Sequence, residues 1–312
     1  MEVIRDIREI KPLSSSVLTI GSYDGIHRGH HDVLSSVVSH AHARRVPSVL
    51  ITFDPHPRHV LDPDADKLSL IMGIEQKLEI IESLGLDMVN IIDFTDTFSK
   101  TTASEFLDIM VIPFYNPKHI IVGYDHHFGF QREGSPKFLK KYCNNLNIGL
   151  EIIDPISDQG QIISSSRIRQ LIQGGFIRRA NFELGSVFGF NAKVIHGAGR
   201  GKNLDFPTAN VIPIEKNQLM PKPSVYFTRG RICGLQMYGM CNFGVRPTFN
   251  ESKLVMEIHF FHENLDDLYG KEIRIDFLEK IREEEKFPSP EALKNQLNND
   301  KLKCLELQGK YE

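Results

Sequence analysis

The pattern of apolar residues changes near residue 185, and this change constrains the fold more than any other feature. Before it, short runs rich in valine and isoleucine alternate with stretches of helical spacing. The runs lie at residues 16–20, 47–53, 87–94, 118–124 and 149–155. Continuous apolar strands that alternate with amphipathic helices are typical of a parallel sheet covered on both faces. The first half is therefore predicted to be an α/β domain with a doubly wound parallel sheet.

After residue 185, helical spacing fades and short segments alternate between polar and apolar residues, with turn residues between them. This alternation predicts antiparallel strands in a small β-barrel or sandwich. Near the C-terminus, Ser289 or Pro290 is predicted to start a terminal helix. We predict two domains, residues 1–184 and residues 185–312.

Composition excludes several classes of protein. The chain has 312 residues and a net charge of −3 at pH 7, so its overall field favours neither nucleic acid nor an acidic membrane. No apolar run approaches the roughly 20 residues needed to span a bilayer, and the N-terminal residues lack a signal-peptide segment. The cysteines form no Cys-x-x-Cys pair and are interpreted as reduced thiols. We expect a cytoplasmic protein that binds neither nucleic acid nor membranes; self-association is left open.

Unusual polar clusters follow three of the predicted strands. They read GSYDGIHRGH (21–30), FDPHP (53–57) and GYDHHFG (123–129). Ligands of open parallel sheets bind beyond the carboxyl ends of the strands. The clusters are therefore predicted to lie at one ligand-binding edge of the sheet.

The first cluster has the composition of a phosphate-binding turn. Gly21, Gly25 and Gly29 would let the backbone approach a phosphate closely at a helix N-terminus, which carries roughly half a positive charge. His27 and His30 are spaced to share one face and to donate hydrogen bonds to one polyphosphate. Neither a Walker A loop nor a dinucleotide-binding fingerprint is present.

Two other interpretations of these histidines remain open. With Asp24 and His31, they could ligate zinc, or they could belong to an ordinary surface loop. The glycines and the strand–turn–helix context favour phosphate binding.

A second basic element, SSSRIR, covers residues 164–169. Arg167 and Arg169 offer guanidinium forks that suit phosphate oxygens, and the adjacent serines offer hydroxyl groups. The alternative is a capped amphipathic helix whose arginines face solvent.

The His-x-Gly-His spacing resembles the signature of the nucleotidylyl transferases, and the chain as a whole resembles the bacterial bifunctional riboflavin kinases and FAD synthetases. The resemblance runs nearly end to end. In the first half it rests on GSYDGIHRGH, TFDPHP, VGYDHHFG and ISSSRIR. In the second half it rests on FPTAN, NFGVRPTF, MEIHFF and LYGKEIRIDFLEKIREEEKF.

The resemblance implies that the first domain transfers AMP from ATP to FMN, giving FAD and pyrophosphate. A substrate phosphate attacks, so no protein nucleophile is needed. Catalysis would fall to His27, His30, Arg167 and Arg169. The remaining implied ATP contacts are Gly21, Asp24, Gly25, Gly29, Ser165 and Ser166. The implied flavin contacts are Asp54, Pro55, His56, Pro57, Gly123, Asp125, Phe128 and Gly129.

Phe53 and Phe128 are chemically suited to the flavin, because an isoalloxazine ring favours flat apolar partners. For Phe53, packing in the core is an equally good interpretation.

For the second domain, the resemblance implies a riboflavin kinase. Thr208 and Asn210 would hold Mg²⁺, and Glu257 would act as general base on the ribityl hydroxyl. Asn242 and Arg246 would contact the flavin. From its residues alone, Glu257 is a solvent-facing strand position, because it alternates with apolar neighbours.

Four positions depart from the family pattern. Ser22 and Tyr23 stand where Asn and Phe are usual, and both keep comparable chemistry. Asp205 and Ser224 each replace a glycine. If the backbone at either has positive φ, the replacement costs about 1–2 kcal/mol. Asp205 would also repel ATP phosphates unless it joined the Mg²⁺ shell.

Three alternatives to the bifunctional enzyme remain open at the level of sequence. The first, motivated by Asp205, is an FMN adenylyltransferase whose barrel binds flavin but is inactive as a kinase. The second is a nucleotidylyl transferase acting on another acceptor, which the C-terminal motifs oppose. The third is an oligonucleotide-binding barrel, which would need a basic groove studded with aromatic residues.

Overall fold

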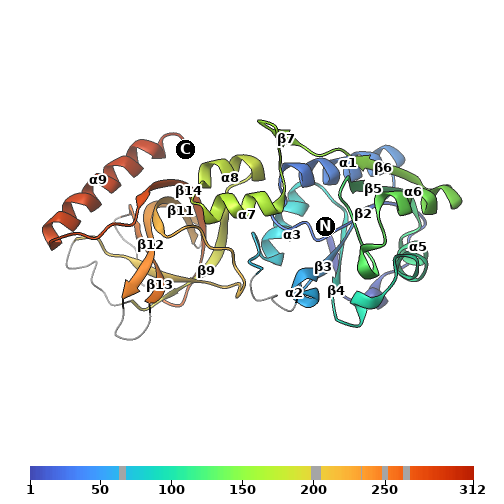
Figure 1. Cartoon of the computed structure of the whole chain (residues 1–312), viewed down its shortest axis with the longest axis horizontal. Coiled ribbons are helices and arrows are strands. Elements are labelled where there is room, and N and C mark those ends of the chain that lie inside the picture. Colours follow the sequence, from blue (N-terminus) through green and yellow to red (C-terminus); the bar gives the residue numbers. More distant parts are fainter. Residues whose placement is uncertain (63–67, 198–204, 233, 248–251, 263–267) are drawn as a thin grey trace. The chain divides into compact units, whose positions relative to one another are not determined.

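The computed structural model describes residues 1–62, 68–197, 205–232, 234–247, 252–262 and 268–312 (Figure 1). It divides into two compact units. The first contains Met1–Ser69 and Ile74–Ser165, and the second contains Leu70–Gly73 and Ser166–Glu312. No helix within the described ranges combines the length and apolarity needed to cross a membrane.

The first unit is built on a six-stranded sheet in which every pairing is parallel. Its spatial order is β1-β4-β3-β2-β5-β6. The strands are β1 (Glu2–Ile4), β2 (Ser16–Ile20), β3 (Ser48–Asp54), β4 (Met88–Asp93), β5 (Pro117–Gly123) and β6 (Gly149–Ile153). The predicted parallel sheet is confirmed. The five apolar runs form β2 to β6, whereas β1 is an edge strand of three residues that the pattern did not predict.

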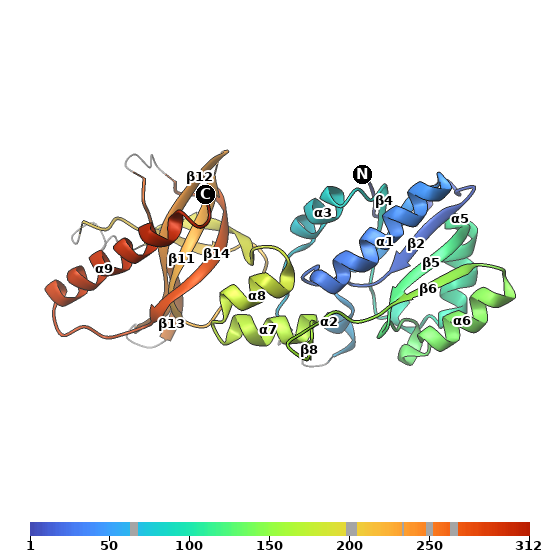
Figure 2. The same ribbon diagram turned by 90° about the horizontal axis from the view of Figure 1, so that it is seen from above.

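The strand order places the helices on both faces of this sheet. From β2 to β4 the chain adds each new strand on one side of β2. The chain then crosses the sheet, and β5 and β6 are added on the other side of β2. Right-handed crossovers therefore put the two sets of helices on opposite faces. Figure 2 shows this for α1 (Arg28–Arg44) and α6 (Pro136–Asn145). The order reverses between β2 and β5, where ligands of such sheets bind.

The connections also contain short elements. They are η1 (Ile7–Glu9), α2 (Pro57–Leu61), α3 (Ile74–Ser83), η3 (Phe98–Lys100), α4 (Ala103–Glu105), η4 (Phe106–Val111), α5 (Ile112–Tyr115), η5 (Phe130–Arg132), β7 (Ser157–Asp158) and β8 (Gln161–Ile162). Aromatic and aliphatic side chains from η4, α5 and α6 pack against the inner strands to form the core of the unit.

The second unit is a closed antiparallel barrel of order β10-β13-β12-β11-β14-β9, as predicted. Its strands are β9 (Gly189–Ile195), β10 (Ala209–Pro213), β11 (Ser224–Ile232), β12 (Leu235–Pro247), β13 (Ser252–Phe260) and β14 (Glu272–Glu283). They follow α7 (Ser165–Gln173), which begins at the last residue of the first unit, and α8 (Ile177–Leu184).

The predicted terminal helix is α9 (Pro290–Gln308) (Figure 1). Ser289 is its N-cap, and its hydroxyl accepts a hydrogen bond from the Ala292 N–H at 3.1 Å. Buried Asp300 of α9 accepts hydrogen bonds from Arg282 of β14, the shortest at 2.8 Å, which fixes the helix on the barrel.

Three of the cysteines, Cys143, Cys241 and Cys304, are unpaired and buried. Burial raises the pKa of the Cys143 thiol to about 11 and that of Cys304 to about 12. These thiols are therefore protonated near neutral pH. Cys233 lies outside the described residues.

Candidate active sites

The glycine-rich turn after β2 has a backbone that constrains its residues. Gly25 has a φ of +86° and Tyr23 has a φ of +48°. A Cβ atom on Gly21 would lie 2.8 Å from the Tyr23 ring, so a side chain at position 21 would collide with it. The Tyr23 hydroxyl is hydrogen-bonded to the Thr19 hydroxyl at 2.6 Å, which anchors the ring under the turn. The Tyr23 ring therefore packs against the turn and supports its backbone.

His27 and His30 lie side by side at the start of α1. His27 is the N-cap residue, and its Nδ1 accepts a hydrogen bond from the His30 N–H at 3.4 Å. The two imidazole rings are stacked, with centroids 3.6 Å apart. The Tyr23 ring contacts His30 edge-on at 4.9 Å. The spacing predicted that both histidines share one face of a helical turn; the structure makes His27 the N-cap and does bring the two imidazoles together.

Burial keeps these imidazoles uncharged. It lowers the pKa of His27 to about 4 and, with the neighbouring His27 and Lys77, holds the pKa of His30 well below its usual range. A neutral imidazole keeps one N–H donor and one lone pair. The Nδ1 atom of His30 is buried and has no hydrogen-bond partner within the described residues.

The shifted pKa of His27 predicts a pH-dependent stability. Below pH 6.5 the unfolded chain binds a proton at this imidazole and the folded chain does not, so stability is full above pH 6.5 and falls as the pH approaches 4. We expect His27→Asn to remove about 3 kcal/mol of this loss. Urea unfolding of the first unit at several pH values measures it, with exposed His42→Asn as control. The same dependence of the unfolding free energy on pH in the wild type, His27→Asn and His42→Asn would contradict the prediction.

Lys77 of α3 is a site residue that the sequence analysis missed. Its side chain is buried, and its Nζ donates a 2.7 Å hydrogen bond to the carbonyl of Ser22 in the turn. Burial lowers the pKa of Lys77, while the charges of Asp24 and Asp54 act to raise it. The sequence feature that could have indicated its burial is its position three residues after Ile74, on the core-facing side of the helix.

If the turn carries out the AMP transfer that the resemblance implies, we expect Lys77→Met to slow it about 10- to 100-fold, because a buried charged hydrogen bond to the turn is lost while the side-chain volume is kept. Lys77 positions the turn, so Lys77→Arg should restore part of the rate. Initial rates of FAD formation at varied ATP separate kcat from KM. An unchanged kcat and KM in Lys77→Met would contradict this role.

The basic element after β8 has its own partners. Ser165 Oγ donates to the Asp24 carbonyl at 2.7 Å, which ties the first residue of α7 to the turn. Ser166, Arg167 and Arg169 belong to the second unit.

Arg167 is not a solvated arginine. Its Nε donates to both carboxylate oxygens of Glu183, at 2.9 and 3.0 Å. Glu183 is fully buried, and Arg179 Nε also donates to it at 2.8 Å. This ion pair fixes the Arg167 side chain between α7 and α8.

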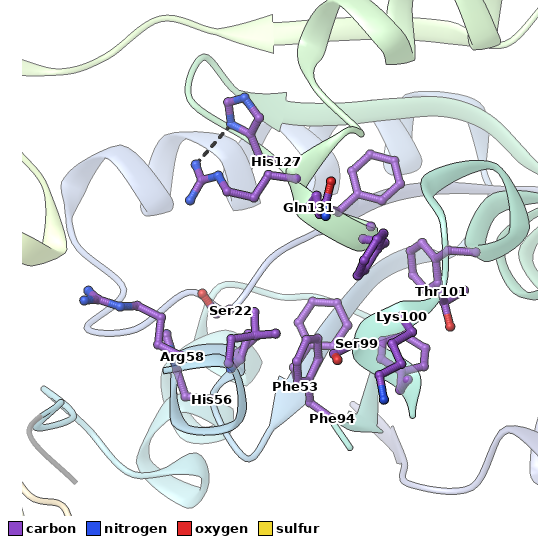
Figure 3. Close-up of a pocket in the computed structure, with 18 of the residues that line it drawn as sticks. Ser22, Phe53, His56, Arg58, Phe94, Ser99, Lys100, Thr101, His127 and Gln131 are labelled. Carbon is purple, nitrogen blue, oxygen red and sulfur yellow. Dashed lines mark hydrogen bonds between the residues drawn. The ribbon is translucent and has the colours of Figure 1, made fainter. Parts of the chain in front are cut away.

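A cavity of about 570 Å³ opens at the carboxyl edge of the first unit's sheet (Figure 3). Gly21 and Ser22 of the turn line it, so the cavity and the histidine site share one loop. Phenylalanines dominate its apolar walls: Phe130 lines it, and so does a series formed by Phe53, Phe94, Phe98, Phe106 and Phe128. Consecutive members of this series have ring centroids 5.5 to 5.9 Å apart and meet edge to face.

The predicted flavin residues divide into two groups. His56, Pro57, Phe128 and Gly129 line the cavity, and so does Phe53. Figure 3 shows Phe53 on one side of the cavity, with residues of the loop after β5 on the other.

The other four predicted flavin residues lie at the same edge without lining the cavity. Asp54 ends β3 and is joined to Pro55 by a cis peptide bond, while Gly123 ends β5 and Asp125 follows it. Phe94, Phe98 and Phe106 were not predicted. The sequence feature that could have indicated these three residues is the group of phenylalanines that follows β4 along the chain.

In the barrel, strand register brings three predicted residues into one row. Asn210 of β10 is paired with Glu257 of β13, which is paired in turn with Asn242 of β12. Asn210 is buried, Glu257 is half-buried and Asn242 is exposed. Thr208 immediately precedes β10.

Asn210 is held closely by its surroundings. A Cβ atom on Gly197 would lie 2.0 Å from the Asn210 amide nitrogen, so only glycine leaves room for this side chain. The backbone of Arg246 lies on β12, but its side chain is outside the described structure, as are residues 248 and 249 of the same motif.

The two replaced glycine positions behave differently. Asp205 has a φ of +62°, the left-handed region that favours glycine. Its carboxylate accepts a 2.6 Å hydrogen bond from Lys294 Nζ of α9. Ser224 lies in β11 without positive φ, and its hydroxyl donates to Glu283 at 3.2 Å. Strain therefore arises only at Asp205, and the charge of that residue has a partner.

Comparisons with known proteins agree with this two-part organisation. A family model described as FAD synthetase matches residues 9–167, and one described as riboflavin kinase matches residues 184–307. A Bacillus subtilis protein named bifunctional riboflavin kinase/FMN adenylyltransferase is 32% identical over 94% of this chain and 92% of its own. An Escherichia coli protein of the same name is 31% identical over 99% of this chain and 98% of its own.

Among solved structures, one described as a macrolide-efflux protein from Streptococcus pneumoniae matches with a TM-score of 0.87 and 30% identity, covering 96% of both chains. The efflux activity is ascribed to that protein alone, and the likeness to it concerns the fold.

Proposed function

The chain belongs to the bifunctional riboflavin kinase/FMN adenylyltransferase family, and on that premise we propose which residues carry out each of its two reactions. As a member of this family, it converts riboflavin to FMN and FMN to FAD, with ATP as co-substrate in both steps. The two family models match separate parts of the chain, so the alternative with an inactive barrel is not favoured.

We assign AMP transfer to the turn at residues 21–30. The phosphate of FMN attacks the α-phosphorus of ATP, the bond to the β-phosphate oxygen breaks, and pyrophosphate leaves. His27 and His30 are neutral before ATP binds and adjacent, so each offers an N–H to the polyphosphate. Bound phosphate raises the pKa of both groups, and the imidazoles then stabilise the leaving pyrophosphate.

Further ATP contacts complete this assignment. Ser165 is tied to the carbonyl of Asp24, directly beside the turn. Ser166, Arg167 and Arg169 continue the same helix and offer a hydroxyl and two guanidinium groups to phosphate oxygens.

We assign the isoalloxazine ring of FMN to the phenylalanine-lined cavity. A volume of about 570 Å³ lies in the range of small-molecule sites, and the apolar rings suit a flat aromatic ligand. Its location beside Gly21 and Ser22 supports the assignment, because the FMN phosphate must reach the ATP bound at the turn.

In the barrel we assign riboflavin phosphorylation to the row of Asn210, Glu257 and Asn242. Glu257 takes the proton of the terminal ribityl hydroxyl as that oxygen attacks the γ-phosphorus of ATP, and ADP leaves. Asn242 is exposed beside Glu257 on the adjacent strand, where it can contact the flavin. Arg246, four residue pairs further along β12, is assigned to the flavin as well.

Thr208 and Asn210 fit the Mg²⁺ that the family implies. Both offer neutral oxygen ligands, and Gly197 leaves a space beside Asn210 that a Cβ atom would fill. Bound Mg²⁺ supplies neutralisation of the ATP phosphate charge. A cytoplasmic location agrees with the unpaired, buried thiols of the chain.

The main observation behind this proposal is that the two family models match separate parts of the chain. Purified protein is incubated with ATP and Mg²⁺ and with either riboflavin or FMN, and the flavins are separated by chromatography. FAD is expected from both starting materials. FAD from FMN alone would contradict the kinase assignment and direct attention to Asp205.

Asp205 itself gives a stability prediction. Asp205→Gly should stabilise the barrel by about 1 kcal/mol, because relief of the positive φ outweighs the exposed Lys294 ion pair. Thermal unfolding of the barrel measures this. Ser224→Gly is the matched control and should destabilise it, since Ser224 is an unstrained strand residue. A destabilised Asp205→Gly protein would show that the ion pair dominates.

A further inference from the structure

Two histidines and a glutamate cluster on the first unit, away from the glycine-rich turn. His40 lies in the second half of α1, His119 near the start of β5 and Glu151 in β6. One ligand atom of each lies within 4.8 Å of the other two. His40 is ten residues after His30, about 15 Å along the helix, so this cluster is separate from the proposed polyphosphate site.

One oxygen of the Glu151 carboxylate lies near both imidazoles, whose ring centroids are 4.6 Å apart. Glu151 Oε2 is 3.1 Å from His40 Nε2 and 3.9 Å from His119 Nε2. Ligands of a tetrahedral ion with bonds of about 2.0 Å lie about 3.3 Å apart. The His40–Glu151 pair is already near this spacing, and a shift of less than 1 Å by His119 would bring the His119–Glu151 pair to it. The ligand atoms of the two imidazoles lie within 4.8 Å of each other.

His119 has the features of a ligand without its ion. Its Nε2 is buried and has no hydrogen-bond partner in the described structure. A Cβ atom on Gly149 would lie 2.1 Å from His119 Nδ1, so this glycine makes room for the ring.

We propose that His40, His119 and Glu151 bind one divalent cation of the zinc class, with water as the fourth ligand. Two imidazoles and one carboxylate suit Zn²⁺, whereas Mg²⁺ prefers a shell of oxygen atoms. Binding at Nε2 requires the neutral His40 ring to change tautomer, so its single proton moves from Nε2 to Nδ1. The ion would fasten α1 to β5 and β6, on the side of the unit away from the proposed catalytic turn.

Arg44 controls the affinity of this site. Its Nη1 lies 3.2 Å from His40 Nδ1 and donates to the His40 carbonyl at 3.1 Å. Arginine only donates, so Nδ1 accepts and the His40 proton lies on Nε2, where the cation must bind. Cation binding moves the ring proton to Nδ1 and breaks the first Arg44 contact. Removing this arginine should therefore strengthen binding.

The test is a Co²⁺ titration of chelator-treated, full-length protein without nucleotide or flavin, followed by displacement with Zn²⁺. His30→Ala is the background, because the histidines of the catalytic turn could bind metal as well. We expect the visible absorption of tetrahedral Co²⁺ at one ion per chain. His40→Gln and Glu151→Gln should each weaken binding at least tenfold, and Arg44→Gln should tighten it several-fold.

His42→Ala is the matched control, because His42 is exposed on the same helix and should leave binding unchanged. Zn²⁺ should also raise the thermal unfolding temperature of the parent protein but not that of Glu151→Gln. The same Co²⁺ spectrum in His40→Gln and Glu151→Gln, or no tetrahedral spectrum in the parent, would overturn the proposal. FAD formation from FMN should match wild type when Glu151→Gln is made in the wild-type chain.

Discussion

Replacing His30 by alanine is expected to lower FAD formation from FMN by about 100- to 1,000-fold while FMN formation from riboflavin continues at the wild-type rate. The His30 imidazole is buried, neutral and stacked on His27, so its N–H is already placed for a developing phosphate charge. A donor fixed in advance acts in the transition state without the reorganisation that water would require.

The measurement is the rate of each step, with FMN or riboflavin supplied separately and the flavins resolved by chromatography. His42→Ala changes an exposed histidine of the same helix and should alter neither rate. Loss of both steps in a folded His30→Ala protein would show that the two sites are not independent. FAD formation near the wild-type rate would exclude His30 from catalysis.

Much of the fold could be predicted because each domain has its own periodicity. The inner strands β2 to β5 are buried in the sheet and read as continuous apolar runs, whereas barrel strands alternate. Edge strand β1 has three residues, too few for a pattern. The pairing of Asn210 with Glu257 could not be predicted, because register depends on contacts between strands far apart in the chain.

The candidate site could be predicted where local chemistry is unusual. Three glycines and two histidines after a strand already indicate a phosphate site. Lys77 was missed because a lysine in a helix is normally exposed, and its burial depends on the distant carbonyl of Ser22. The cavity walls at Phe94, Phe98 and Phe106 were missed for a similar reason, since aromatic residues in a sequence most often indicate core packing.

Asp205 illustrates a prediction with two separable parts. Its replacement of glycine correctly indicated a strained position, since φ is +62°. The expected repulsion of ATP phosphates did not take account of Lys294, whose ammonium group lies 2.6 Å from the carboxylate. That partner lies 89 residues away along the chain, so only the folded barrel brings the two charges together.

Glu257→Gln is expected to have the opposite effect to His30→Ala: FMN formation from riboflavin should fall about 100- to 10,000-fold, while FAD formation from FMN is retained. A hydroxyl must lose its proton as it attacks, whereas the phosphate of FMN is already ionised. Glutamine keeps the size of the side chain beside Asn210 but cannot accept that proton. Glu272→Gln changes an exposed glutamate of the same barrel and is the matched control. The measurement is the rate of each step in both variants. FMN production near the wild-type rate in Glu257→Gln would mean that another group is the base.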